Sequence, residues 1–201
     1  MSSETDQIDG GRRHFLLVAT TVTGIAGAAL TAVPFLASWK PSARAQALGA
    51  PVEADISKLE PGAIVKVTWR GQAIYIVRRT QEMLAALATA EVKNGLRDPD
   101  SAESTQPDYA KNETRALKPE FLVLIGVCTH LGCAPLDRFQ PKDAELGATW
   151  PGGFYCPCHG SKFDLAGRVF KDVPAPLNLA VPPYRFVNEG VIQIGADAEV
   201  A

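Results

Sequence analysis

The sequence has few cysteines and almost no net charge, and each of these shortages excludes a class of protein. Four cysteines in 201 residues are too few for a disulfide scaffold of this size. With 20 basic and 22 acidic side chains, the net charge is -2, so the chain lacks the excess positive charge with which proteins bind a nucleic-acid backbone. A content of 46% hydrophobic and 21% charged residues also excludes collagen-like and low-complexity chains. These figures predict one globular domain with one accessory segment and no nucleic-acid partner.

Charge is also missing from one long stretch near the N-terminus. No residue between Phe15 and Trp39 is charged. At ~1.5 Å per residue, a helix of this length crosses a hydrocarbon core of ~30 Å. We therefore predict a transmembrane anchor helix over residues 14–39. A buried helix of a soluble protein is the alternative, and the length of the uncharged run between Arg13 and Lys40 argues against it.

The residues before this helix indicate its direction. The run from Arg12 to Phe15 resembles a twin-arginine signal, which exports proteins that are already folded. An ordinary basic flank under the positive-inside rule is the alternative. Both interpretations predict that residues 1–13 are cytoplasmic and that the chain after Lys40 lies outside. Ala43-Arg44-Ala45 offers a cleavage site of small residues, but the length of the apolar stretch favours a retained anchor.

Residues 40–51 are predicted to form a flexible hinge linker. Pro41 and Pro51 bracket a run of small residues, a composition typical of a connection between two parts of a chain. A passive spacer and a hinge are both compatible with it.

The remaining chain, residues 52–201, is predicted to be mostly β. Runs rich in β-branched residues are typical of strands. Turn residues at Arg70-Gly71 and at 188–190 separate two pairs of such runs. The predicted strands are residues 63–69, 73–77, 121–127, 184–187 and 191–194.

Two segments of this domain depart from the β pattern. Residues 80–90 predict one helix with Thr80 as its N-cap. The apolar face of this helix consists of Met83, Leu84 and Leu87. The polar, proline-containing stretch from Lys93 to Lys118 predicts an inserted surface excursion that carries partner contacts.

All four cysteines and two of the three histidines fall in two short boxes. The boxes are Cys128-Thr-His130-Leu-Gly-Cys133 and Cys156-Pro-Cys158-His159-Gly-Ser161. Each box offers one cysteine and one histidine in matched positions, which leaves Cys133 and Cys158 as a surplus pair. A tetrahedral zinc site uses similar ligands, but its spacing groups cysteines and histidines as separate pairs and does not explain two further cysteines.

The boxes resemble those of the Rieske iron–sulfur proteins. In that family one iron of a [2Fe-2S] cluster is held by two thiolates and the other by two imidazoles. The six-residue form of both boxes is similar to that of the Rieske subunit of the quinol:cytochrome c reductase, or cytochrome bc1, complex. The resemblance implies an all-β Rieske domain with one N-terminal transmembrane helix. A small cluster-binding subdomain, residues 125–178, is inserted in its β-sandwich-like base.

The resemblance also implies a role for each residue of the boxes. Cys128 and Cys156 bind the inner iron, and His130 and His159 bind the outer iron. Cys133 forms a disulfide with Cys158 that braces the two loops, which an exported domain permits.

Residues around the boxes extend the resemblance. Val173-Pro174-Ala-Pro176 is similar to the proline loop that covers the cluster in this family. Ser161 is expected to donate a hydrogen bond to a cluster sulfur or a ligand thiolate. Two positions differ from the family pattern: Lys171-Asp172 stands where relatives often carry a glycine, and Phe163 stands where many carry a tyrosine. A purely packing role is the alternative for Phe163.

The function implied is that of an electron-transfer subunit of the cytochrome bc1 complex. The cluster takes one electron from quinol, with release of a proton, and passes it to a c-type cytochrome. His159 is expected to contact the quinol, with Leu131 near the exposed tip. The implied partners are cytochrome b, a c-type cytochrome, quinol and membrane lipid, in a dimeric complex. The implied location is the bacterial inner membrane, with the cluster domain on the periplasmic side.

Two other functions fit parts of the sequence. A Rieske subunit of an arsenite-oxidase-type enzyme is also exported, but needs neither a retained helix nor a hinge. A structural metal-binding module without redox activity is the other alternative.

Overall fold

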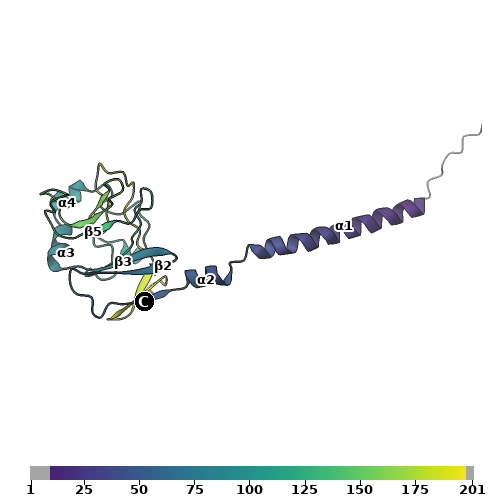
Figure 1. Ribbon diagram of the computed structural model, residues 1–201, viewed down its shortest axis with the longest axis horizontal. Coiled ribbons are helices and arrows are strands. Elements are labelled where there is room, and N and C mark those ends of the chain that lie inside the picture. Colours follow the sequence, from purple (N-terminus) through teal and green to yellow (C-terminus); the bar gives the residue numbers. More distant parts are fainter. Residues whose placement is uncertain (1–9, 198–201) are drawn as a thin grey trace, which may run out of the picture. The chain divides into compact units, whose positions relative to one another are not determined.

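The computed structural model describes residues 10–197. The chain divides between Ala47 and Leu48 into two units, an N-terminal helical unit and a folded domain. Figure 1 shows both, coloured along the sequence. Of the predicted cytoplasmic segment 1–13, residues 1–9 lie outside the described residues.

The N-terminal unit contains the predicted apolar helix. Helix α1 spans Gly10–Ser38, so it begins four residues before the predicted start. It is long and apolar enough to cross a membrane, and none of its side chains is buried by other parts of the protein. The hydroxyls of Thr21 and Thr31 donate to the carbonyls of Leu17 and Gly27, at 2.8 and 2.7 Å. Bonds within the helix satisfy these polar groups, as a lipid environment requires.

The predicted linker is helical in part, which its composition did not lead us to expect. Helix α2 spans Ala43–Gly49. The backbone N–H of Ala45 donates to the Ser42 hydroxyl at 3.2 Å, so Ser42 closes the first turn. Alanine, leucine and glutamine are strong helix formers, and this preference outweighs the proline brackets. None of the seven residues of α2 is buried.

The folded domain consists of three antiparallel sheets of three strands each, as an all-β Rieske domain implies. The first has the order β1-β9-β8, the second β2-β3-β4 and the third β5-β6-β7. The strands are β1 Val52–Asp55, β2 Ile64–Trp69, β3 Gln72–Arg78, β4 Phe121–Ile125, β5 Leu136–Arg138, β6 Gly153–Tyr155, β7 Lys162–Phe163, β8 Tyr184–Asn188 and β9 Val191–Ile194.

The predicted hairpins are confirmed. Strands β2 and β3 pair from Ile64 with Val77 to Trp69 with Gln72. Arg70 and Gly71 both have positive φ angles, 50° and 74°. Two left-handed residues in a row give the turn whose twist matches that of the paired strands. The central strand β3 and its neighbour β4 are buried along most of their length and carry much of the core.

The predicted helix 80–90 is shorter than expected, and a second helix follows it. Helix α3 spans Gln81–Leu87, capped by the Thr80 hydroxyl, which accepts from the N–H of Met83 at 3.2 Å. Helix α4 spans Ala90–Gly95. The Thr89 hydroxyl accepts from the N–H of Val92, so it starts a new helix where the first one ends. Met83 and Leu87 are buried as predicted, and Leu84 is half-buried.

Residues 93–118 are exposed or half-buried along most of their length, but a few of them anchor the segment in the domain. Leu96, Ala110, Arg115 and Ala116 are at most 2% exposed. The segment includes the short 3-10 helix η1, Asp108–Ala110, and its buried residues pack into the domain. Its polar composition suggested solvent exposure, but hydrogen bonds inside the domain satisfy its polar groups.

Buried arginines provide many of these bonds. Arg115 donates to the carbonyls of Ala166 and Leu179 at 3.0 and 2.8 Å. Arg79 donates to the carbonyls of Pro119, Thr114 and Leu165. Burial lowers the pKa of both guanidinium groups to about 10, which leaves them charged at neutral pH. The two side chains join segment 93–118 to the turn after β7.

Candidate metal centre

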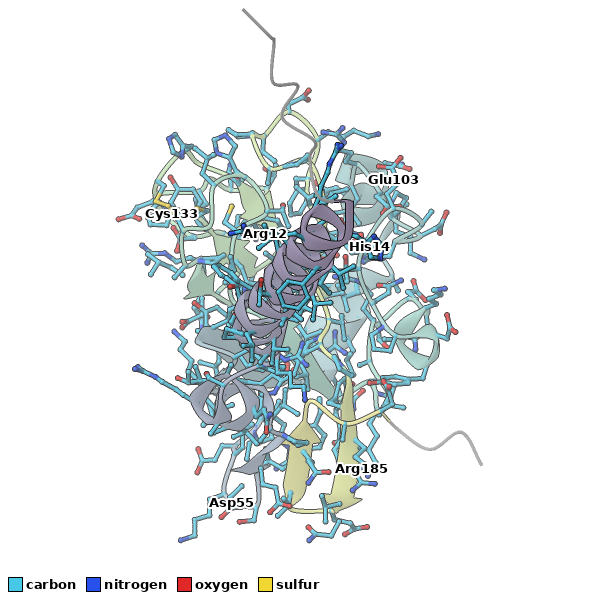
Figure 2. All side chains as sticks on the ribbon, turned by 90° about the vertical axis from the view of Figure 1, so that its right-hand side faces the viewer. Arg12, His14, Asp55, Glu103, Cys133 and Arg185 are labelled. Carbon is cyan, nitrogen blue, oxygen red and sulfur yellow. A yellow bond between two sulfur atoms is a disulfide. The ribbon has the colours of Figure 1, made fainter. Side chains whose placement is uncertain are left out.

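Two loops carry the cysteine and histidine boxes, and both start and end at strands of the folded domain. The first loop leaves β4, passes Cys128 and His130, and enters β5 after Cys133. The second leaves β6 at Tyr155, directly before Cys156, and enters β7 after Ser161. In Figure 2, Cys133 lies toward the end of the domain opposite Asp55 and Arg185. The loops therefore stand at one end of the domain, and three of the four strands that flank them, β5, β6 and β7, form one small sheet.

The two loops share one backbone frame. The N–H of Cys128 donates to the carbonyl of Cys133 at 2.7 Å, and the N–H of Cys156 donates to that of Ser161 at 2.8 Å. Four residues after each of these cysteines, a glycine donates back to its carbonyl at 3.0 and 2.9 Å. These glycines, Gly132 and Gly160, have φ angles of 83° and 78°, in the left-handed region that favours glycine.

This frame corrects one detail of the sequence prediction. The cysteines Cys128 and Cys156 occupy matched positions, but the histidines do not, because His130 is two residues and His159 three residues after its cysteine. The residue that matches His130 in the frame is Cys158. The two imidazoles therefore lie close together although each is a different number of residues from its cysteine.

The possible metal ligands separate into a buried pair and an outer pair. The thiols of Cys128 and Cys156 belong to residues that are 2% exposed. The rings of His130 and His159 lie at the surface, with their centroids 4.7 Å apart and their planes at 86°. Of these, His159 is exposed and His130 half-buried. The structure thus places the two thiols next to each other and the two imidazoles next to each other, on the same two loops.

The surroundings of Cys128 include groups that raise the pKa of its thiol and groups that lower it. Burial raises its pKa above the ordinary value, and the neighbouring Cys156 side chain raises it further. A hydrogen bond from the His130 backbone and one from the Ser161 side chain lower it. The two donors compensate part of the cost of a buried negative sulfur, so they are suited to a thiolate. A bound metal ion would offset the remaining cost of burying a negative sulfur, because its positive charge stabilises the thiolate that coordinates it.

A disulfide joins Cys133 to Cys158, the pair that the resemblance implied. The sulfur atoms of Cys133, Cys156 and Cys158 lie within 4.8 Å of one another. Two of these three form the disulfide and lack the thiolate that a metal requires, so the trio is not a site by itself. The disulfide links the end of the first loop to the middle of the second, beside the buried thiols.

The proline loop, Val173–Pro176, is held against both boxes. The hydroxyl of Ser161, a buried residue, accepts from the N–H of Ala175 at 3.0 Å. The Thr129 hydroxyl donates to the carbonyl of Leu177 at 2.6 Å. Pro174 is exposed, and Leu131 is 71% exposed at the tip of the first loop. Sequence reasoning missed Thr129, because its partner lies 48 residues away and no local pattern indicates it.

The two positions that differ from the family pattern are explained in part. Asp172 has a φ angle of 57°, a backbone conformation that glycine adopts without strain. Phe163 is completely buried and pairs with Phe154 across β6 and β7. Asp172 therefore accepts a conformation that favours glycine, and Phe163 has a packing role whatever else it does.

Comparisons with known proteins agree with this geometry. The family model "Rieske [2Fe-2S] domain" matches residues 50–184, and "Ubiquitinol-cytochrome C reductase Fe-S subunit TAT signal" matches residues 1–42. The "Ubiquinol-cytochrome c reductase iron-sulfur subunit" of Allochromatium vinosum is 58% identical, over 92% of this chain and 89% of the relative. The protein of that name from Blastochloris viridis is 44% identical, over 96% and 98%. A chain from "Hyperthermophilic respiratory Complex III" is 25% identical, with a TM-score of 0.47, over 87% and 97%.

Proposed function

From the premise that this chain belongs to the family of Rieske iron–sulfur subunits of ubiquinol–cytochrome c reductase, we propose that it transfers electrons from quinol to a c-type cytochrome. The observation that carries the proposal is a pair of buried thiols and a pair of surface imidazoles on two loops at one end of the domain. The chain alone is an electron carrier, and turnover belongs to the complex.

Cys128 and Cys156 would hold the inner iron, and His130 and His159 the outer iron. The chemistry of the four side chains fits a [2Fe-2S] group of the Rieske type, which needs two sulfur and two nitrogen ligands. Their depth in the domain supports the same division, since the sulfur pair is buried and the nitrogen pair lies at the surface. When bound, such a cluster accepts one electron at a potential of roughly -150 to +300 mV, above that of all-cysteine clusters.

His159 would contact the quinol. It is more exposed than His130, and Leu131 provides an exposed apolar side chain on the facing loop. An imidazole bound to iron through one nitrogen keeps the other to accept a hydrogen bond or a proton. A quinol gives up a proton with its electron, so the free ring nitrogen of His159 would receive that proton.

The partners would be a cytochrome b that presents quinol at the imidazoles and a c-type cytochrome that receives the electron. The N-terminal helix and the match to an export-signal model support a membrane-anchored subunit. We place the folded domain on the periplasmic side of a bacterial inner membrane, in a dimeric complex. The length of α1 supports contact with membrane lipid.

Residues 40–51 would act as a hinge between two electron-transfer positions. Helix α2 has only seven residues and buries none of them. A helix this short is only marginally stable without tertiary contacts. The segment is therefore suited to changing its conformation as the domain moves between a quinol site and a haem.

Quinol-dependent reduction of cytochrome c in membranes tests this function. Membranes that contain the native complex should show it, and membranes with the His159→Ala chain should lose most of it. A Lys58→Ala chain, altered on the domain surface outside the boxes, provides the matched control. Full activity with His159→Ala, or no quinol dependence with the native chain, would contradict the proposal. The second outcome would favour another exported oxidoreductase, such as an arsenite-oxidase-type enzyme.

A further inference from the structure

One buried tyrosine outside the boxes contacts the chain beside both of them. Tyr75 belongs to the central strand β3 and is 3% exposed. Its neighbours include residues just before or just after the cysteines at three separate points of the two loops. It is 53 residues away in sequence from Cys128, and no motif of the sequence indicates it.

The first contact point is the start of the first loop. Gly126 lies two residues before Cys128, and a Cβ atom added there would stand 2.4 Å from the Tyr75 ring. The ring therefore occupies the place of a side chain at this position. The backbone N–H of Gly126 also donates to the carbonyl of Ala73 on β3, at 2.8 Å. The chain that leads to Cys128 is thus fixed against the Tyr75 ring.

The second contact point is the end of the first loop. The Tyr75 hydroxyl donates to the carbonyl of Pro135 at 2.9 Å, in a buried position. Pro135 lies two residues after Cys133, which forms the disulfide with Cys158. A buried carbonyl that loses its donor has no water to replace it, so this bond is costly to break.

The third contact point is the start of the second loop. The Tyr75 ring stacks on Phe154, with centroids 6.1 Å apart and planes at 24°. Phe154 lies two residues before Cys156. One aromatic ring thus contacts the residues two positions before both of the buried cysteines.

A surface ion pair supports the same connection. Lys66 of β2 pairs with Asp137 of β5 at 2.9 Å, and its ammonium group lies 4.9 Å from the centre of the Tyr75 ring. Asp137 is two residues after Pro135. The base sheet β2-β3-β4 therefore holds the beginning of β5 through two side chains, one buried and one at the surface.

We propose that Tyr75 is a positioning residue. Its hydroxyl, through the carbonyl of Pro135, fixes the first loop on the base sheet and so holds His130 in its place beside His159. The ring provides packing, which phenylalanine supplies equally well. The hydroxyl provides the directional bond, which phenylalanine lacks. The inference rests on the proposed function, because the geometry held in this way is that of the proposed ligands.

The test compares two variants that each lose one tyrosine hydroxyl bonded to the backbone. Tyr75→Phe removes the bond to Pro135. Tyr109→Phe is the matched control, because the Tyr109 hydroxyl binds the backbone of Tyr184, at the start of β8, outside both boxes. In the purified complex, hydrogen exchange of the peptide covering 128–136 should accelerate roughly tenfold in Tyr75→Phe, relative to the control. The electron paramagnetic resonance lines of the reduced cluster should broaden only in Tyr75→Phe, because the ligands then adopt a wider range of positions.

If the Tyr75→Phe protein does not accumulate in the membrane, a variant of the surface ion pair provides the test instead. Lys66→Met removes the ion pair to Asp137. It should broaden the same resonance lines and accelerate hydrogen exchange of the same peptide, but by only about twofold. Equal effects of Tyr75→Phe and Tyr109→Phe, or unchanged loops in both Tyr75→Phe and Lys66→Met, would overturn the inference. Failure of the proposed function is distinguishable, because the unaltered chain itself would then lack the signal of a histidine-ligated cluster.

Discussion

Single residues next to the thiols should set how easily the site is reduced. Ser161 is buried, and its side chain forms a hydrogen bond with Cys128, one of the proposed ligands. A hydrogen bond donated to a ligand sulfur stabilises the more electron-rich reduced state. A bond worth ~1 kcal/mol corresponds to roughly 40 mV for one electron. Ser161→Ala should therefore lower the potential by tens of millivolts in protein-film voltammetry, and an unchanged potential would contradict the role of this bond.

A substitution at Phe163 should shift the reduction potential in the opposite direction. It is fully buried in the same short strand that follows the second loop, and it has no hydroxyl to donate. Phe163→Tyr should raise the potential by tens of millivolts, because a new donor lies near the sulfur ligands. The same voltammetry on a folded domain checks this. A loss of thermal stability without an upward shift would indicate that Phe163 only packs against Phe154.

A buried charge pair should carry a large share of the domain's stability. Arg168 and Asp164 are at most 2% exposed and pair at 2.7 Å. Arg168→Met leaves the carboxylate without its partner, which should cost about 3–5 kcal/mol of unfolding free energy. Adding Asp164→Asn removes the unpaired charge and should restore part of that loss. Chemical denaturation of the single and double variants measures both, and a double variant less stable than Arg168→Met would contradict this explanation.

At this scale the sequence indicated the proposed ligands and missed the residues around them. Cys128, His130, Cys156 and His159 could be proposed because their two short boxes resemble those of a known family. Thr129 and Tyr75 were missed because their roles depend on partners 48 and 60 residues away. Threonine and tyrosine are also ordinary strand and loop residues, so their type alone predicts nothing.

Among the structural elements, the two loops depend on their disulfide. Cys133 and Cys158 are joined across 25 residues. Replacing both with alanine should lower the unfolding free energy by about 2–4 kcal/mol while some cluster still assembles, because neither is a proposed ligand. Thermal unfolding and the yield of cluster measure the two effects. Cys128→Ser is the contrasting variant, since it should lose the cluster first. Unchanged stability and potential in the double alanine variant would contradict this role of the disulfide.

Helix α2 is the element through which the hinge can be tested. Its seven residues span ~10 Å as a helix and ~23 Å when extended, so unwinding it lengthens the connection. Ala43→Glu with Ala47→Lys adds an ion pair one turn apart, which should stabilise the helix and slow turnover about twofold. Ala47→Gly, the matched control, weakens the helix and should not slow turnover. Equal rates in both variants, with an unchanged cluster spectrum, would argue against a hinge.

The elements differ in how well their sequence indicates them. Strands β2 and β3 follow from alternating β-branched residues and from the turn at Arg70-Gly71, all of which act locally. Helix α2 was missed because the linker interpretation gave more weight to the prolines than to the helix preference of alanine. The anchoring of segment 93–118 in the domain was not predicted, because it depends on long-range hydrogen bonds that composition does not indicate.

At the scale of the whole molecule, one chain combines a membrane-type helix, a short helical connection and a domain with the proposed metal ligands at one end. The proposed function requires all three, because an electron carrier of the membrane must stay there and still reach two partners. The chain divides between Ala47 and Leu48, inside the predicted linker of residues 40–51. The roles of these segments remain predictions that only the complex can test.

The central claim is that two histidines and two cysteines hold one redox-active [2Fe-2S] cluster. Pulsed electron paramagnetic resonance of the reduced complex, with the histidines of this chain labelled with nitrogen-15, tests it most directly. The claim predicts a rhombic [2Fe-2S] signal coupled to two labelled nitrogens, reduced to one in His130→Cys and in His159→Cys wherever a cluster still assembles. A signal with no histidine coupling, or a site that holds zinc and gives no signal on reduction, would contradict it.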